Sequence, residues 1–444
     1  MANGRMYIVS DPLLASQVQR ASATLSFEEL IVQATGRLVG ISKEAAEILK
    51  DPNCKEEGRD RMVTEVIQKV IHPLLGPQAI ASLASVQLQH FTEFVNSIPE
   101  GLDTELFHLL TREISAATAL TFYGPRNPFA EHPELTEEFW KWETDIVPYM
   151  MNIMRPLTAR KAYNAINRVS AGFEEYLEKG RQAQASELIR RRQKAHQDVG
   201  ISIPDQARLE VTMTLGISVN AAISIFWLVN NICSRPALLE EIREEIRTKG
   251  LVSPNTISFS ALRESCPLLN SALRETLRLI APLATTRYVL KDTIVADTYL
   301  LRKDCIVQIA GNLIHADKQI WGPDAESFNP RRFLYTMNGS KTLDDGTVPD
   351  SKVNQIHPVA FRAFGGGSSL CPGRHFAQME ILSLTAALLM GFEFAPPKGK
   401  AKVEWDPEFD DNKFVIGAFK PRRGVDVRVK RREGMENVKW AIQF

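Results

Sequence analysis

The chain carries the segment FGGGSSLCPG at residues 364–373, in which three consecutive glycines are followed by a single cysteine, Cys371. Glycine adopts backbone conformations that other residues avoid, so such a loop can turn several N–H groups toward one atom. Residues 372–390 are largely apolar and predict a helix that begins directly after the cysteine. Free backbone N–H groups and the helix dipole at that position favour the thiolate form of Cys371.

A thiolate held by backbone donors in a dry loop is suited to be the axial ligand of a haem iron. It donates electron density to the metal and favours cleavage of an O–O bond. Phe364 would pack against this loop and tune the surroundings of the sulfur. Two other sites are possible: a phosphate-binding loop, which needs a lysine that is absent here, and a cysteine nucleophile, for which His375 is the only nearby histidine. We favour haem ligation by Cys371.

Two shorter patterns precede the cysteine. Glu275 and Arg278 lie three residues apart on a helix predicted to begin at Pro267, so they share one helix face. Arg332 lies in FNPRRF at residues 328–333. Alone, each pattern is weak, because most such pairs are exposed ion pairs worth less than ~1 kcal/mol.

Together these three segments resemble the cytochrome P450 superfamily. The signature F-x-x-G-x-x-x-C-x-G is met by Phe364, Gly367, Cys371 and Gly373, and the E-x-x-R and P-x-R-F motifs come before it in the same order as in that family. The resemblance implies one mainly α-helical catalytic domain with a smaller β part over residues 1–444. In that fold, a helical prism surrounds a buried haem b.

The resemblance also implies roles for the other residues of the motifs. Glu275, Arg278 and Arg332 would form a buried triad that locks the loop leading to the cysteine. Arg287 would pair with a haem propionate. Many relatives place a second propionate partner, Arg or His, two residues before the cysteine, where this chain has Ser369. His90 and Lys69 are open candidates for the missing partner.

A long helix is predicted over residues 205–234, capped by Asp205, and the resemblance places it across the distal face of the haem. Most P450 monooxygenases carry A-G-x-[DE]-T there, whereas this chain has LGISVN at 215–220, with no acid. Asn220 stands near the usual threonine. We expect Asn220 and Ser218 to serve in proton delivery, with an ordered water or the substrate's own hydroxyl as alternatives.

This departure resembles the branch that contains cholesterol 7α-hydroxylase, oxysterol 7α-hydroxylase and prostacyclin synthase, and a fungal secondary-metabolism member is expected. The reaction expected is insertion of one oxygen atom from O2 into an apolar sterol, terpenoid or similar polycyclic substrate, with electrons from NADPH–cytochrome P450 reductase. Two alternatives remain: isomerisation or dehydration of a peroxide without external electrons, and a truncated, non-catalytic haem binder. By the resemblance, substrate contacts are expected from three largely apolar segments: the distal helix around 214–221, residues 283–286, and the late hairpin near 416–419. The candidates named are Leu283, Ala284, Thr285 and Ile416.

Composition narrows the remaining classes. Lys+Arg and Asp+Glu both number 53, so the net charge is zero and nothing indicates nucleic acid. The five cysteines are widely spaced and odd in number, which favours neither a zinc site nor a disulfide framework. No run of about 18 apolar residues is found, so no membrane-spanning helix is expected.

Hydrophobic periodicity predicts the other elements. Helices are expected over 26–39, 77–96, 102–120, 173–198, 236–249 (ended by Gly250) and 267–280, a strand over 5–10, short strands after 287, and hairpins in the last fifty residues, including a basic one over 420–432.

The chain begins at what resembles the second strand of the family's first sheet, so the resemblance implies that roughly sixty or more residues of eukaryotic relatives have no counterpart here. With a membrane anchor restored, the resemblance implies a monomer on the cytosolic face of the endoplasmic reticulum, in contact with the membrane surface.

Overall fold

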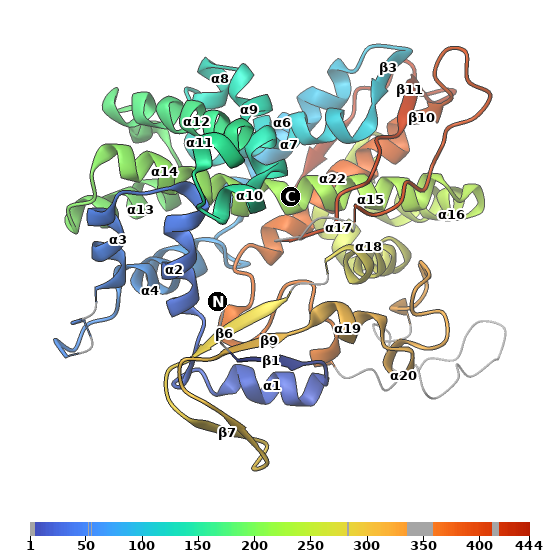
Figure 1. Ribbon diagram of the computed structural model, residues 1–444. Coiled ribbons are helices and arrows are strands. Elements are labelled where there is room, and N and C mark those ends of the chain that lie inside the picture. Colours follow the sequence, from blue (N-terminus) through green and yellow to red (C-terminus); the bar gives the residue numbers. More distant parts are fainter. Residues whose placement is uncertain (1–4, 52, 55, 282–283, 335–357, 411–416) are drawn as a thin grey trace.

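The computed structural model describes residues 5–51, 53–54, 56–281, 284–334, 358–410 and 417–444 (Figure 1). Helices dominate, and small sheets lie at the edges, as the sequence predicts. This is the mainly α-helical class with a smaller β part.

The elements of the first half are β1 (Met6–Val9), α1 (Pro12–Arg20), β2 (Leu25–Ser26), α2 (Glu28–Val39), α3 (Lys43–Lys50), α4 (Met62–Glu65), the π-helical turn η1 (Val66–Ile71), α5 (His72–Leu74), α6 (Ala81–Ser97), β3 (Leu102–Glu105), α7 (Leu106–Tyr123), α8 (Pro128–Glu131), α9 (Glu134–Thr144), α10 (Ile146–Met150), α11 (Arg155–Thr158), α12 (Arg160–Glu178), α13 (Glu187–Asp198) and α14 (Ile203–Thr214).

Those of the second half are the π-helical turn η3 (Leu215–Val219), α15 (Asn220–Cys233), α16 (Pro236–Glu245), the π-helical turn η4 (Ile246–Gly250), β4 (Leu251–Ser253), β5 (Thr256–Ser258), α17 (Phe259–Ser265), α18 (Pro267–Ile280), β6 (Thr285–Val289), β7 (Thr293–Val295), β8 (Tyr299–Leu301), β9 (Ile306–Ile309), α19 (Gly311–Ala316), α20 (Lys318–Trp321), α22 (Arg374–Gly391), β10 (Phe392–Ala395), β11 (Asp426–Arg431) and β12 (Ala441–Gln443).

The long distal helix runs through the middle of the molecule as α14, η3 and α15. It is capped by the Ser202 hydroxyl, which accepts from the N–H of Asp205. Asp205, the expected cap, lies within the first turn. Its carboxylate accepts from the backbone N–H of Ser42 at 2.7 Å and from the Ser42 hydroxyl at 2.8 Å. In the described residues, the span Ile203–Cys233 alone is long and apolar enough to cross a membrane. Because 72% of its most apolar window is buried inside the protein, it is a core helix.

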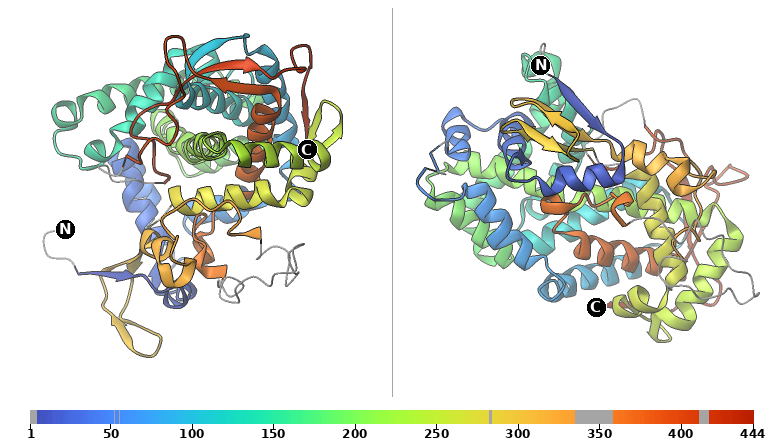
Figure 2. Two further views of the ribbon diagram at one scale, coloured as in Figure 1. Left: turned by 90° about the vertical axis from the view of Figure 1, so that its right-hand side faces the viewer. Right: turned by 90° about the horizontal axis from the view of Figure 1, so that it is seen from below.

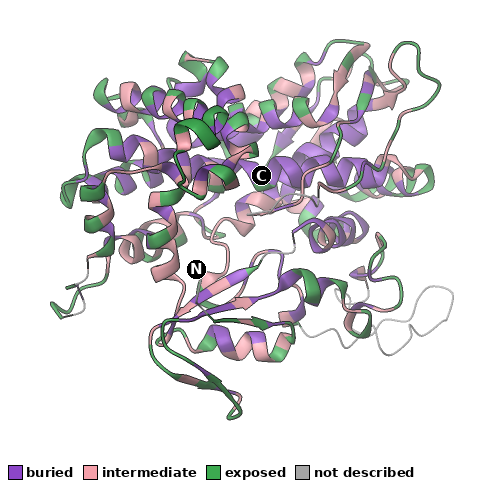
Figure 3. Cartoon of the chain, in the orientation of Figure 1, coloured by how far each residue is buried: buried purple, intermediate pink, exposed green. Residues whose placement is uncertain are grey.

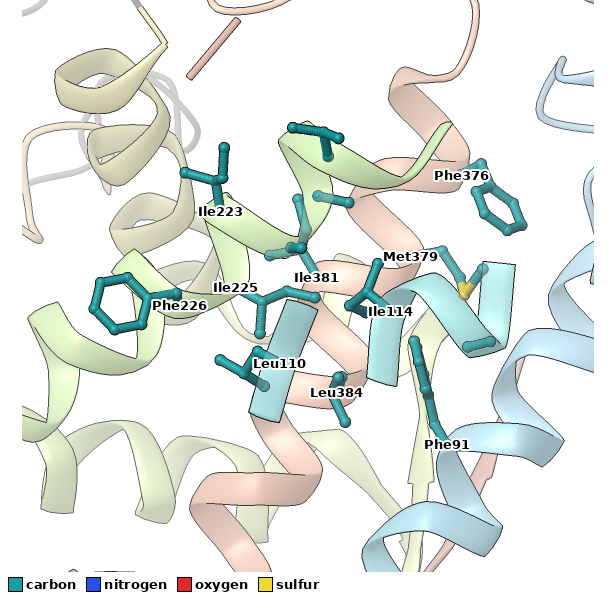
Figure 4. Packing of buried hydrophobic residues seen from close by; sticks show 14 of the residues in the cluster. Phe91, Leu110, Ile114, Ile223, Ile225, Phe226, Phe376, Met379, Ile381 and Leu384 are labelled. Carbon is teal, nitrogen blue, oxygen red and sulfur yellow. The ribbon is translucent and has the colours of Figure 1, made fainter. Parts of the chain in front are cut away.

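Helix α15 packs against α7, α18 and α22. Figure 4 shows the shared core, in which apolar side chains of α15, α7, α22 and α6 interlock; the labelled ones are Ile223, Ile225, Phe226, Leu110, Ile114, Phe376, Met379, Ile381, Leu384 and Phe91. Phe226 is fully buried, which contributes about 1.5–3 kcal/mol relative to an exposed ring. In Figure 3, α15 and α22 are buried along most of their length. The core therefore fixes the distal helix and the helix after the cysteine as one unit.

A four-stranded sheet in the order β1-β9-β6-β2 lies beside α1 (Figure 1; Figure 2 shows it from two further sides). β1 pairs with β9 in parallel, and β6 pairs with β9 in antiparallel register. Residues of β6 alternate between buried and half-buried, so Arg287 faces the interior.

Four details differ from the expectations. The helix predicted over 173–198 is two helices, α12 and α13, separated by Gly180 at φ +65° and restarted by Ser186 as an N-cap. Gly250 belongs to a π-helical turn rather than to a left-handed cap. Strand β3 precedes α7, where a continuous helix was expected. The basic segment forms β11, which pairs with β10 and β3 and not with a hairpin partner of its own.

Candidate active site

The glycine loop folds tightly around the cysteine. The N–H of Cys371 donates to the carbonyl of Phe364 at 2.8 Å, which closes the loop. Gly365 and Gly367 have φ values of +75° and +58°, which L side chains rarely adopt. A Cβ on Gly365 would also lie 2.8 Å from the carbonyl oxygen of Ser369. These two positions therefore require glycine.

Helix α1 supports the loop from the other side. The Gln19 side chain is buried against the glycines, and a Cβ on Gly366 would lie 2.9 Å from its Oε1. The Nε2 atom of Gln19 is buried without a hydrogen-bond partner in the part of the chain that the structure describes.

The thiol of Cys371 is half-buried. Burial raises its pKa, while backbone N–H groups of Gly373 and Arg374 and the charge of Arg374 oppose the rise. The backbone N–H groups at the helix start thus favour the thiolate, as expected, but burial outweighs them and the net direction is upward. A coordinated metal ion is a much stronger source of that ionisation than the helix end.

Glu275, Arg278 and Arg332 meet in a buried cluster. Arg278 donates to both carboxylate oxygens of Glu275, from Nε and from Nη2, at 2.8 Å each. Arg332 Nε donates to Glu275 Oε1 at 2.9 Å, and the N–H of Asn329 donates to the same oxygen at 3.1 Å. The three charged side chains are at most 5% exposed. A buried carboxylate with bidentate and charge-assisted donors is a rigid junction between α18 and the segment before the cysteine loop.

His315 joins this cluster to the cysteine loop. Arg278 Nη1 donates to the carbonyl of His315 at 2.5 Å, and His315 Nδ1 donates back to the carbonyl of Arg278 at 2.8 Å. The N–H of Arg362 donates to His315 Nε2 at 2.8 Å, so that nitrogen accepts and the imidazole is neutral. Burial lowers the pKa of His315 to about 3, which keeps it neutral. Arg362 is two residues before Phe364, so this chain of hydrogen bonds clamps the buried cluster to the cysteine loop.

Arg287 reaches the same loop from β6. Its Nη2 donates to the hydroxyl of Ser369 at 2.7 Å and its Nη1 to the carbonyl of Thr286 at 3.0 Å. The guanidinium lies under the ring of Phe27, 4.9 Å from its centroid. Burial and, to a smaller extent, the charge of Arg362 lower the pKa of Arg287 to about 10.

The two open candidates for a second propionate partner are engaged elsewhere. His90 pairs with Glu113 at 3.0 Å, and Lys69 pairs with Glu65 at 2.6 Å on the surface.

On the distal helix, the π-helical turn η3 brings Gly216 and Asn220 to one exposed face. The Oδ1 atom of Asn220 accepts from the N–H of Ala418 at 3.0 Å. Ser218 does not share that face: it is buried, and its hydroxyl donates to the Thr214 carbonyl of its own helix at 2.7 Å. The expected proton-delivery pair is therefore split, and only Asn220 faces outward from the helix.

The late segment 417–420 runs along the distal helix. Trp227 Nε1 donates to the carbonyl of Phe419 at 2.8 Å, and the N–H of Phe419 donates to the carbonyl of Ile280 at 2.8 Å. Among the expected substrate contacts, Ala284 is exposed and Thr285 is buried at the start of β6. Leu283 and Ile416 lie outside the described residues.

Comparison with protein-family models matches residues 135–417 to the family described as Cytochrome P450. The chain belongs to this family. It is 27% identical to "Cytochrome P450 monooxygenase nodJ" of Hypoxylon pulicicidum, over 99% of this chain and 84% of that protein. It is also 27% identical to a "Cytochrome P450 monooxygenase" of Gibberella zeae, over 98% of this chain and 82% of that one. "Bifunctional cytochrome P450/NADPH--P450 reductase ALT2" of Alternaria alternata is 24% identical over 83% of this chain and 32% of its own length.

The chain is thus a haem-dependent oxidoreductase of the fungal monooxygenase type, in a family whose members use O2 and a reductase partner. Its own residues fit haem. Cys371 offers a half-buried sulfur, and beside it Arg287 is a fully buried guanidinium with an Nε atom that has no partner among the described residues. Haem carries two carboxylates that such a cation can pair with. Cys371 would ligate the iron, and Arg287 would hold a propionate.

Sequence reasoning missed Gln19, His315, Arg362 and Gly417. One signal was available: Arg362 stands between Phe361 and Phe364 in FRAF, an unusual place for a charge. His315 and Gln19 act through folding of distant segments, which no local pattern reports.

Proposed function

We propose that this protein inserts one oxygen atom from O2 into an apolar, polycyclic substrate such as a sterol or terpenoid, with electrons from an NADPH–cytochrome P450 reductase. The carrying observation is the half-buried Cys371 in a glycine loop clamped through His315 and the Glu275–Arg278–Arg332 cluster. Such a clamp holds a metal ligand at a fixed position, which a reaction centre requires.

Bound haem supplies the activation of O2. The residues of this chain then orient the substrate and determine where protons come from. Asn220 is neutral, so its amide can orient a water or a substrate oxygen but cannot act as an acid. Because its oxygen is occupied by Ala418, it presents its NH2 group as a donor. A water or a hydroxyl group of the substrate is the proton source that this arrangement supports.

The apolar character of the substrate is supported by the residues around the distal helix. Ala221 on α15 and Ala418 in the late segment are both apolar and nearly buried, and Phe419 runs alongside. Apolar pockets with a few placed polar groups bind apolar ligands and fix their orientation. Asn220 would be such a polar group.

Electron supply from an NADPH–P450 reductase is supported by one relative. ALT2 is named as a bifunctional protein that joins a P450 to an NADPH–P450 reductase.

We propose that the protein is a monomer in contact with a membrane surface and that, with an N-terminal anchor, it lies on the cytosolic face of the endoplasmic reticulum. Four large apolar side chains are 59–70% exposed in one short segment that follows α10 and includes α11: Met151, Ile153, Met154 and Leu157. Clustered exposed apolar residues mark surfaces that bind membranes or proteins. Arg160, which is exposed in the same region, would suit anionic headgroups.

The second candidate function is rearrangement or dehydration of a peroxide without external electrons. The acid-free distal face favours it, because that chemistry needs no proton delivery to O2. A non-catalytic haem binder is the third.

One experiment separates the three. The purified protein is reduced under CO, and then supplied with 18O2, NADPH and reductase, or with a hydroperoxide alone, in the presence of sterols and terpenoids. A strongly red-shifted Soret band that is lost in Cys371→Ser, together with NADPH-dependent 18O in a product, supports the monooxygenase. Turnover of the hydroperoxide without NADPH and without 18O supports the isomerase, and thiolate-ligated haem with no product supports the binder.

A further inference from the structure

Two buried arginines beside the cysteine loop have no counter-charge. Six arginines are buried in the described part of the chain: Arg192, Arg243, Arg278, Arg287, Arg332 and Arg362. Four of them pair with carboxylates: Arg192 with Glu210, Arg243 with Glu240 and Glu393, Arg278 with Glu275, and Arg332 with Glu275 and Asp324. Arg287 and Arg362 have no such partner among the described residues.

Arg362 has more unsatisfied hydrogen-bond donors than Arg287. It is 1% exposed, and only its Nη1 makes a hydrogen bond, to the carbonyl of Val359 at 3.3 Å. Its Nε and Nη2 are buried without a partner in the described part of the chain. Leaving a buried charged donor unsatisfied is costly, so native proteins almost always provide an acceptor.

Both arginines are bound to the cysteine loop: Arg287 Nη2 donates to the hydroxyl of Ser369 at 2.7 Å, and the carbonyl of Arg362 accepts from the N–H of Gly365 at 2.9 Å. The charge of Arg362 lowers the pKa of Arg287, on top of the effect of burial. Like charges that are buried together destabilise a fold unless an anion lies between or beside them. The buried nitrogens without a partner around this loop are Nε2 of Gln19, Nε of Arg287, and Nε and Nη2 of Arg362. All of them are hydrogen-bond donors, so an anion suits the space between them.

Arg362 is held in place by its own backbone. Its N–H donates to the neutral His315, which is fixed by Arg278, so the side chain leaves the main chain from a rigid point. The loop position two residues before Cys371 is Ser369, whose hydroxyl accepts from Arg287 and donates to the carbonyl of Gly366 at 3.0 Å. Ser369 thus orients one arginine and offers no charge of its own.

We propose that Arg362 is the second cationic anchor for the haem carboxylates in this protein and acts beside Arg287. It replaces the charge that is absent at Ser369. The family signature does not include this position. The inference rests on the haem assignment and adds a residue to it.

The test measures haem release from holoprotein to excess apomyoglobin, with haem or with haem dimethyl ester, which lacks both carboxylates. With haem, Arg362→Met is expected to release about tenfold faster or more, the effect of losing one charge-assisted hydrogen bond. Arg362→Lys, which keeps the charge without the planar fork, is expected to fall between. With the dimethyl ester, wild type and Arg362→Met are expected to release at the same rate.

Arg243→Met is the matched control, a buried arginine between α16 and α22 that already has carboxylate partners. It is expected to change release of both haems by the same factor. The proposal is wrong if Arg362→Met accelerates the release of haem and of its dimethyl ester equally. Arg362 would then support the fold or hold a free anion in the adjoining cavity of about 290 Å³. A red-shifted ferrous–CO band in every variant keeps this outcome distinct from a failure of Cys371 ligation.

Discussion

Asn220 and Ala418 are joined across 198 residues by a hydrogen bond of 3.0 Å from the backbone N–H to the side-chain oxygen. Because the donor is a main-chain N–H, the atom that receives it must be the amide oxygen, and the NH2 group is turned away from it. Gly417 makes this contact possible, since a Cβ there would overlap the Asn220 side chain. The distal face therefore presents a hydrogen-bond donor in a fixed direction.

Asn220→Leu is expected to lower product formation by roughly tenfold or more, as loss of a hydrogen bond to a reacting oxygen does, while NADPH consumption continues. Asn220→Asp keeps the acceptor for Ala418 and removes the donor, so it separates the two roles. Gly417→Ala should mimic Asn220→Leu without adding to it in the double variant. Coupling of NADPH to product is the measurement, and tight coupling in Asn220→Leu would contradict the role.

Loss of one member of the buried triad should abolish haem retention. Glu275→Gln leaves the buried guanidinium of Arg278 without a carboxylate and Arg332 with Asp324 alone, at about 3–5 kcal/mol. We expect purified Glu275→Gln to lack most of its haem, whereas Glu241→Gln, an exposed partner of Arg331, keeps it. Haem content per chain is measured by the pyridine haemochromogen absorbance, and full occupancy in Glu275→Gln would exclude the locking role.

His315 should make the fold acid-sensitive. Its folded pKa is lowered to about 3 by burial, below an unfolded value of 6.5. Between these values the unfolded chain binds one proton more, so the free energy of unfolding falls as the pH falls, by about 1.4 kcal/mol per pH unit from this residue. The stabilisation is complete above pH 6.5.

Urea unfolding between pH 7 and 4 measures this slope. His315→Asn is expected to be less stable at pH 7, and its free energy of unfolding should depend less on pH. His72→Asn, at an exposed histidine, is the control and should leave the slope unchanged. An unaltered slope in His315→Asn would assign the acid sensitivity to other groups, such as His196, whose pKa burial also lowers.

The exposed apolar segment should control membrane binding. Met151→Ser together with Leu157→Ser is expected to reduce co-sedimentation with vesicles of mixed neutral and anionic lipid several-fold, because each exposed side chain contributes apolar area. Ile294→Ser, at an equally exposed apolar residue on β7, is the control. Unchanged sedimentation of the double variant would place the membrane contact elsewhere.

Local patterns were sufficient for much of this structure. Helix periodicity predicted α15 and α18, and the loop composition predicted the tight turn at Gly365 and Gly367. These features depend on neighbours within a few residues. The π-helical turn η3 could not be predicted from these patterns. Ser218 and Asn220 are two residues apart and therefore point to different sides of the helix.

The contacts that shape the site come from pairings across long sequence distances. Gln19 lies more than 300 residues before the glycines that it supports, and His315 joins Arg278 to Arg362. No periodicity or spacing encodes such meetings, because they depend on where whole elements dock. The unpaired guanidinium of Arg362 is likewise visible only when all of its neighbours are known.

The parallel pairing of Met6–Val9 with Ile306–Ile309 has a consequence for biosynthesis. At roughly 5–20 residues per second, a ribosome needs about 15–60 s to deliver the second strand after the first. Throughout that time β1 and α1 lack their partners, and the cysteine loop that α1 supports has yet to be made. We therefore expect the cofactor to enter after translation has passed the last strands, and chaperones to protect the waiting amino-terminal segment until then.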